Sequence, residues 1–133
     1  MTHRIRERGA SFAEILVALA ILSLALLTMI TVFVKNLSLA GKAEEITVAT
    51  EIGRRQIENI RLMKKDEIPV PTTFTGASVT ADGFPPEPYP AQILDEKRYK
   101  LEVRTSESGD LTLVETTVVW ERGRITLAAL VRP

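Results

Sequence analysis

The feature that most constrains this chain is an uncharged apolar run near its N-terminus. The run extends from Ile15 to Val34 and contains no Asp, Glu, Lys or Arg. A helix of that length rises roughly 30 Å, which matches the hydrocarbon core of a bilayer. The sequence therefore predicts a transmembrane helix over 10–34. The rest of the 133-residue chain suffices for one small domain.

The charges that flank the run predict its orientation. Before it, segment 1–9 carries Arg4, Arg6 and Arg8 against a single acidic residue, Glu7. After it, lysines are soon followed by glutamates, so no comparable excess arises. Positive residues favour the cytoplasmic side. We therefore expect a single-pass membrane protein with a cytoplasmic N-terminus and a C-terminal domain in a periplasm or another extracytoplasmic space.

Segment 35–68 is charged but periodic, which predicts an amphipathic helix. Its apolar stripe recurs at spacings of three and four and comprises Ile46, Ala49, Gly53, Ile57, Ile60 and Met63. No proline occurs before Pro69, so this helix is expected to continue the membrane helix without a break. Pro69 is expected to end the helix at Ile68, because proline lacks the N–H and disfavours helical geometry in the preceding residue.

The remaining sequence predicts a loop followed by a sheet. Six of the seven prolines lie between Pro69 and Pro90, so 69–97 is expected to be a long Pro/Gly-rich loop, with one short strand near 77–81. Over 98–133, apolar and polar residues alternate between Gly- and Asp-containing turns, which indicates an antiparallel meander whose last strand is Ile125–Val131. The predicted fold is α+β: a long N-terminal helix, transmembrane then amphipathic, packed on a small antiparallel β-sheet.

The composition excludes several classes of function. Cysteine is absent and His3 is the single histidine, so the sequence offers no disulfide, no thiolate nucleophile and no metal-ligand cluster. We predict no cofactor, no metal site and no enzymatic activity. Lys plus Arg equals Asp plus Glu, 17 against 17, which argues against a strongly basic nucleic-acid binder.

The junction between leader and apolar run carries the most specific pattern. The basic segment ends in Gly9, Ala10 and Ser11 follow, and Glu14 is the one acidic residue at the start of the hydrophobic run. A carboxylate near hydrocarbon costs free energy, about 2.5 kcal/mol at a bilayer centre and less near its edge. This arrangement resembles the class III signal of type IV prepilins and type II secretion pseudopilins. The resemblance is close over residues 1–65, and beyond them it extends only to the predicted architecture.

The resemblance implies roles for three residues. Prepilin peptidase would cut between Gly9 and Ala10, and the new N-terminus at Ala10 would be N-methylated. Ala10 departs from the family, which usually has Phe or Met there. Glu14 would remain in the membrane segment and act in assembly, by pairing with the Ala10 amine of a neighbouring subunit. Taken alone, Glu14 is explained as well by the favourable position of a carboxylate at a helix N-terminus.

Within that family the chain resembles minor components, the type called minor pilin V or minor pseudopilin I of type II secretion. The membrane segment lacks the proline usual in major pilins, and there is no C-terminal cysteine pair. The resemblance implies a structural subunit that primes or caps a type IV pilus or a type II secretion pseudopilus. Its implied partners are other minor pilins or pseudopilins, the major subunit, prepilin peptidase and the inner-membrane assembly platform.

Other interpretations stay open at this point. The apolar run could be an ordinary signal peptide cleaved near Ser38–Ala40, although it is about twice the usual length, or a plain membrane anchor. The domain could be a filament-borne binding module for DNA or a surface, or an accessory subunit unrelated to pili. For DNA, acidic residues interleave with Arg54 and Arg55, which favours a solvated helix face. We expect Trp120 to be a half-buried strand residue and 84–90 a stiff loop.

Overall fold

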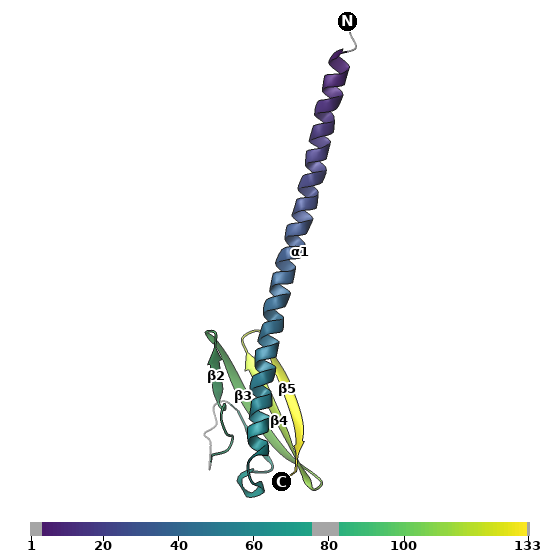
Figure 1. Cartoon of the computed structure of the whole chain (residues 1–133). Helices are drawn as coiled ribbons and strands as arrows, with labels where there is room; N and C mark the ends of the chain where they lie inside the picture. Colours follow the sequence, from purple (N-terminus) through teal and green to yellow (C-terminus); the bar gives the residue numbers. More distant parts are fainter. Residues whose placement is uncertain (1–3, 76–82, 133) are drawn as a thin grey trace. The chain divides into compact units, whose positions relative to one another are not determined.

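The computed structural model describes residues 4–75 and 83–132, except the side chains of 4–11. The chain divides into two units, 1–43 and 44–133. Its elements are a long helix α1 (Arg4–Arg61), a short 3-10 helix η1 (Lys65–Glu67) and a five-stranded antiparallel sheet (Figure 1). The strands are β1 (Thr72–Phe74), β2 (Ala91–Leu94), β3 (Lys97–Ser108), β4 (Leu111–Trp120) and β5 (Gly123–Val131). The expected α+β fold, a long helix with a small antiparallel sheet, is confirmed. The strand expected near 77–81 lies outside the described residues.

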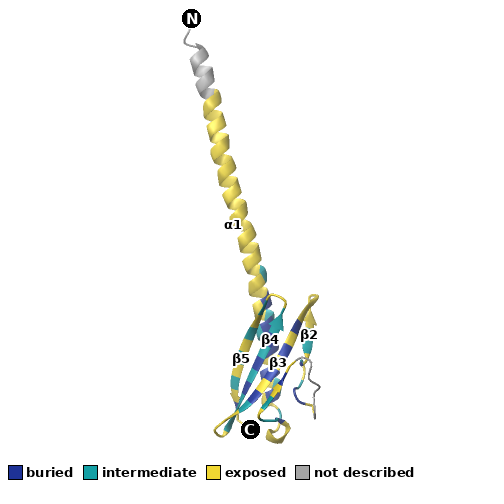
Figure 2. Ribbon diagram, turned by 180° about the vertical axis from the view of Figure 1, so that it is seen from behind, coloured by how far each residue is buried: buried dark blue, intermediate teal, exposed yellow. Residues whose placement is uncertain are grey.

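The second unit is a sheet with the last turns of α1 against one face. The strand order is β1-β3-β4-β5, and β2 also pairs with β3. β3 and β4 pair from Lys100↔Val119 to Ser108↔Leu111, and β4 and β5 pair from Thr112↔Val131 to Trp120↔Gly123. The expected three-strand meander is therefore present. Alternation along β3 buries Tyr99, Leu101 and Val103 toward the helix and exposes the residues between them (Figure 2).

The buried face of α1 contains most of the predicted stripe but not its first residue. Ala49, Ile57 and Ile60 are buried as expected, but Ile46 is 48% exposed and the residue before it, Glu45, is buried. The contact face also includes Ile52 and Gln56, which are both buried. Consecutive helical residues lie 100° apart, so a pattern of apolar residues leaves the phase of the buried face uncertain by about one position.

The helix ends at Arg61, before the predicted end at Ile68. Ile60 is the last buried residue of the helix, and Met63 of the predicted stripe packs half-buried against the core from beyond the helix end. A local cap also competes: the Lys64 N–H donates to the Glu67 carboxylate over 3.0 Å at the start of η1. The turn lets Ile68 be buried in the core, only 7% exposed. A local cap and this tertiary contact therefore end the helix before Pro69 is reached.

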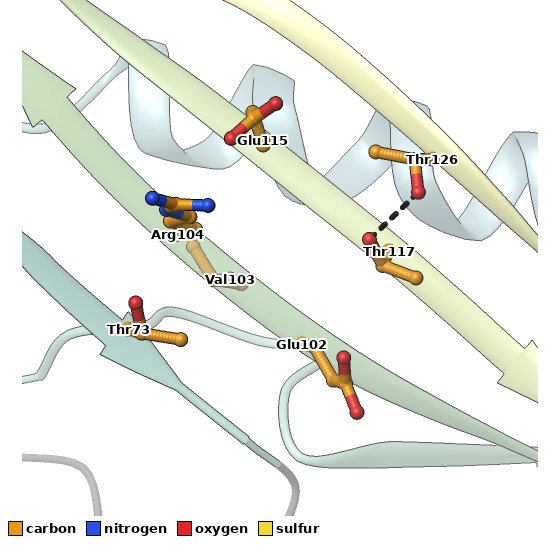
Figure 3. Close-up of a pocket in the computed structure, with 7 residues that line it drawn as sticks. All are labelled: Thr73, Glu102, Val103, Arg104, Glu115, Thr117 and Thr126. Carbon is orange, nitrogen blue, oxygen red and sulfur yellow. Dashed lines mark hydrogen bonds between the residues drawn. The ribbon is translucent and has the colours of Figure 1, made fainter.

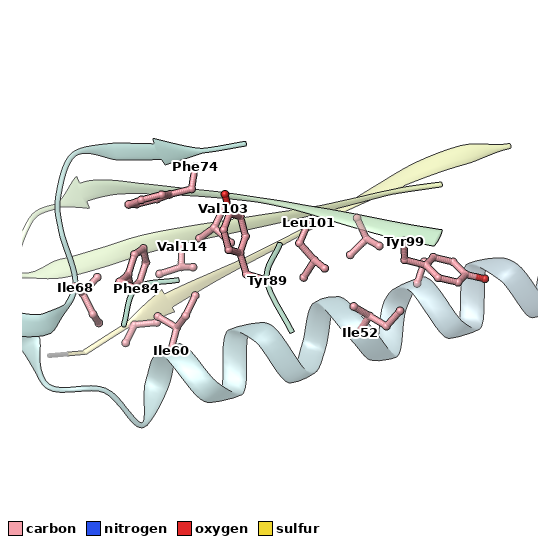
Figure 4. Packing of buried hydrophobic residues seen from close by; sticks show 13 residues of the cluster. Ile52, Ile60, Ile68, Phe74, Phe84, Tyr89, Tyr99, Leu101, Val103 and Val114 are labelled. Atoms are coloured by element: carbon pink, nitrogen blue, oxygen red, sulfur yellow. The ribbon is translucent and has the colours of Figure 1, made fainter. Parts of the chain in front are cut away.

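The Pro/Gly-rich segment contributes strands and core residues that the sequence did not predict. β1 and β2 both pair with β3, and they cover different parts of its outer edge. Phe84 is fully buried and lies edge-to-face with Phe74, with ring centroids 5.3 Å apart. Tyr89 is also buried, 6.3 Å from Phe74 (Figure 4). The aromatic residues of 84–90 therefore serve the core, which agrees with a structural loop.

Hydrogen bonds attach this segment to the rest of the domain. Thr105 on β3 is 2% exposed, and its hydroxyl donates to the Pro69 carbonyl while it accepts from the Thr72 N–H. On the helix, the Asn59 amide donates to the carbonyl of Glu87 over 2.8 Å. These bonds give backbone groups of the loop hydrogen-bond partners on β3 and α1.

Candidate membrane segment and buried carboxylate

The first candidate site is the apolar part of α1. Among the described residues, one helix is long and apolar enough to cross a membrane; its best window has a mean hydropathy of 2.8 and no buried residue. The hydroxyls within the run are satisfied by the helix itself: Ser23 donates to the Leu19 carbonyl, and Thr28 and Thr31 donate to those of Ala25 and Leu27. Length, composition and internal hydrogen bonding therefore make α1 a candidate membrane span.

The residues predicted to act in processing and assembly lie on this helix. Gly9 and Ala10 fall within its first two turns, where the structure describes the backbone alone. Glu14 is exposed, one turn after Ala10, in a stretch whose other described side chains are apolar. One turn of separation places positions 10 and 14 on the same side of the helix. The structure of a single chain brings no second charged group to Glu14 among the described residues.

The second candidate site is a buried carboxylate that the sequence did not reveal. Glu45 belongs to the second unit, beyond the uncharged run, and its side chain is only 4% exposed. Its Oε1 lies 3.0 Å from Lys97 Nζ and 3.7 Å from Arg122 Nη1. Its Oε2 accepts a hydrogen bond from Trp120 Nε1 over 3.1 Å. We call Glu45, Lys97, Trp120 and Arg122 the Glu45 cluster.

The local sequence explains how these side chains meet. Lys97 begins β3 directly after the β2–β3 turn, and Arg122 lies in the turn between β4 and β5. Trp120 pairs with Gly123 across that second turn, and a Cβ added at Gly123 would lie 2.9 Å from the indole ring. The absence of a side chain at Gly123 thus leaves room for the ring to reach Glu45. Trp120 is half-buried, as expected.

The electrostatics of the Glu45 cluster are those of a satisfied ion pair. The hydrogen bond from Lys97 holds the pKa of Glu45 below its ordinary value, although burial acts to raise it. Conversely, the hydrogen bond to Glu45 raises the pKa of Lys97. A carboxylate held ionised by several cationic and neutral donors is a poor general base or acid at neutral pH. The arrangement therefore connects α1 to two turns of the sheet, and a chemical step is not indicated.

A signal for this cluster was present in the sequence but ambiguous. Glu45 lies four residues before Ala49 and seven before Ile52, and both are buried. Burial of a charged residue that is in register with an apolar stripe can be predicted only if the residues that pair with its charge are known. Trp120 is 75 residues away along the chain, so no local pattern identifies it.

The third candidate is a hollow of about 310 Å³ on the face of the sheet opposite the helix. Arg104 on β3 lies there opposite Glu115 on β4, with Glu102 farther along β3 and threonines around them (Figure 3). Thr117 and Thr126 hydrogen-bond to each other across β4 and β5 over 2.8 Å. Two carboxylates against one guanidinium make this hollow unfavourable for a polyanion. Among the described residues, no cluster of His, Cys, Asp or Glu could hold a metal.

Comparisons with protein-family models, with curated proteins and with solved structures found no match to this chain.

Proposed function

We propose that the chain is a minor pilin or pseudopilin, a structural subunit that primes or caps assembly of a type IV pilus or a type II secretion pseudopilus. The observation that carries the proposal is the position of Glu14. It is the one acidic residue in a long apolar stretch, five residues after a glycine that ends a basic segment. A plain anchor would gain from a carboxylate there only the weak attraction of a helix N-terminus, whereas a cut after Gly9 would also create an amine that could neutralise it.

The folded domain is compatible with this role. Its helix continues from the apolar run and buries one face against a small sheet, so membrane segment and domain share one element. We propose that the domain lies in the periplasm and that Ala10, once freed and methylated, meets Glu14 of the next subunit. The alternative of a filament-borne DNA-binding module gains no support from the hollow around Arg104, because Glu102 and Glu115 flank it.

The test is the N-terminal mass of the protein expressed in a bacterium that has prepilin peptidase. The expected N-terminus is a methylated Ala10, and Gly9→Val should leave the chain uncut, because a β-branched residue replaces the side-chain-free one at the cut. Gly41→Val is the matched control, since a Cβ at Gly41 meets no atom within 4 Å; it should be processed normally. A mature chain that starts at Met1, or after Ala40, would contradict the proposal.

A further inference from the structure

The sheet has one long free edge, formed by β5. This strand is the last in the order β1-β3-β4-β5, and it pairs with β4 alone among the described strands (Figures 1 and 2). Every second residue of Gly123–Val131 therefore presents unpaired backbone N–H and C=O groups at this edge, while the others bond to β4. Such an edge is a template on which a further strand can form.

The opposite edge of the sheet, at β3, has features that usually protect a sheet edge, whereas the edge at β5 does not. At the opposite edge β3 is covered by two short strands, of three and four residues. By contrast, β5 pairs with β4 over nine consecutive residues without a bulge. It contains no proline, and Arg124 is its one charged residue. The edge is thus long, regular and apolar, which is the geometry that strand addition requires.

The side chains of β5 would contribute to binding as well as its backbone. Ile125, Leu127 and Ala129 face the helix and are only half-buried, while Leu130 on the outer face is 50% exposed. A strand laid beside β5 would cover both rows. An occupant with alternating apolar side chains would therefore bury surface on both faces of the sheet.

Charge decides against a second copy of this chain as the occupant. Arg122, Arg124 and Arg132 lie in and beside β5, and no acidic residue occurs between 122 and 132. A two-fold antiparallel pair centred on Leu127 would place Arg122 directly opposite the Arg132 of the other copy. Like charges opposite one another destabilise a pair of strands. The complementary occupant is a strand of another protein that carries acidic residues at its ends.

We propose that β5 is a docking edge for an extended segment of another protein, with alternating apolar residues at its centre and Asp or Glu at both ends. The segment adds to the sheet beside β5, and Arg124 and Arg132 select its acidic ends. This inference concerns the folded domain and holds whether or not the chain enters a filament.

The experiment uses the full chain in detergent micelles and a fluorescent synthetic peptide with alternating valine and threonine between pairs of glutamates. Fluorescence anisotropy should show saturable binding, and a peptide with lysines in place of the glutamates should bind more weakly. Arg124→Glu should weaken binding by about fivefold or more, because it replaces an attractive cross-strand pair with a repulsive one. Arg98→Glu is the matched control: Arg98 is an exposed arginine on β3, opposite Ile93, so its reversal should change affinity less than about twofold.

Backbone pairing is tested with two further peptides of the same sequence, N-methylated at alternate residues. Only one side of an added strand bonds to β5, so one of the two peptides should lose binding and the other should keep it. Equal loss with Arg124→Glu and Arg98→Glu, or equal binding by both methylated peptides, would overturn the proposal in favour of unspecific charge attraction. Concentration-dependent dimerisation that Leu130→Lys abolishes would overturn it in favour of a second copy.

Discussion

Glu45 on α1 and Trp120 at the end of β4 form a hydrogen bond of 3.1 Å between residues that are 75 positions apart in the sequence. The same carboxylate holds Lys97 and Arg122, so one side chain connects the helix to two turns of the sheet. The Glu45 side chain is buried, while those of Lys97 and Arg122 are 47% and 65% exposed, so removal of the Glu45 charge loses both ion pairs but leaves the two cations partly solvated.

We therefore expect Glu45→Gln to lower the melting temperature of the domain clearly, since Gln keeps the shape but loses the charge that Lys97 and Arg122 share. Glu58→Gln is the matched control on the same helix. Glu58 pairs with Arg54, but both side chains are more than half exposed, so its loss should have little effect. Thermal unfolding followed by circular dichroism measures both variants. Similar melting temperatures for the two would show that the Glu45 cluster adds no stability.

The pH dependence of stability should reflect the same pair. The folded-state pKa of Glu45 lies below its ordinary value of 4.5, so its contribution is complete above that value and is lost as the pH falls through the lowered pKa. The pKa of Lys97 lies above 10.5, so its contribution is complete below that value and is lost as the pH rises through the raised pKa. Melting temperatures measured across this range should fall less steeply at acid pH for Glu45→Gln than for the wild type.

Gly53 on α1 permits a close approach of the helix to β5. A Cβ at this position would lie 2.6 Å from Leu127 Cδ1 and 3.3 Å from Val118 Cγ2. Gly53→Ala should therefore destabilise the domain by about 1 kcal/mol, because overpacking exceeds the gain in helix propensity. In a Leu127→Ala background the same change should stabilise it by about 1 kcal/mol. A double-mutant cycle from urea unfolding measures the coupling, and additive effects would disprove the contact.

The turn between β2 and β3 holds two non-glycine residues in a left-handed conformation, Asp95 with φ 48° and Glu96 with φ 63°. Two-residue hairpins of this type favour Asn-Gly. The double substitution Asp95→Asn and Glu96→Gly should raise the free energy of unfolding by about 1 kcal/mol. Pro or Val at position 96 should have the opposite effect, because neither tolerates a positive φ. Denaturant midpoints at equal m-values are the measurement.

Glu14→Ala tests the proposed assembly mechanism. It should leave membrane insertion unchanged or improved, because a costly charge is removed, and cleavage after Gly9 should persist. Recovery with partner subunits should fall, since the Ala10 amine of a neighbour loses its counter-charge, and Glu14→Gln should give an intermediate loss. Glu51→Ala, an exposed glutamate farther along α1, is the matched control. If Glu14→Ala and wild type co-purify equally with partner subunits from membranes, Glu14 has no role in assembly and its position reflects only the helix N-terminus.

Patterns that repeat along the chain determined much of this fold before any tertiary contact was known. The uncharged run marks α1 as a candidate span, because length and composition suffice for that inference. The alternation at Tyr99, Leu101 and Val103 predicted β3, since side chains in a strand must alternate between faces. Gly and Asp in the turns then separated β3, β4 and β5, although β5 begins at Gly123, two residues before the predicted Ile125.

Tertiary structure alone decided which residues meet. The burial of Glu45 instead of Ile46 depends on Lys97, Trp120 and Arg122, which come from two distant turns. The helix ends at Arg61 because the turn that follows lets Ile68 pack in the core. β1 and β2 form because each pairs with the edge of β3. The free edge at β5 is likewise a property of strand order. Local sequence carries period and propensity, whereas these features depend on contacts between segments far apart in the chain.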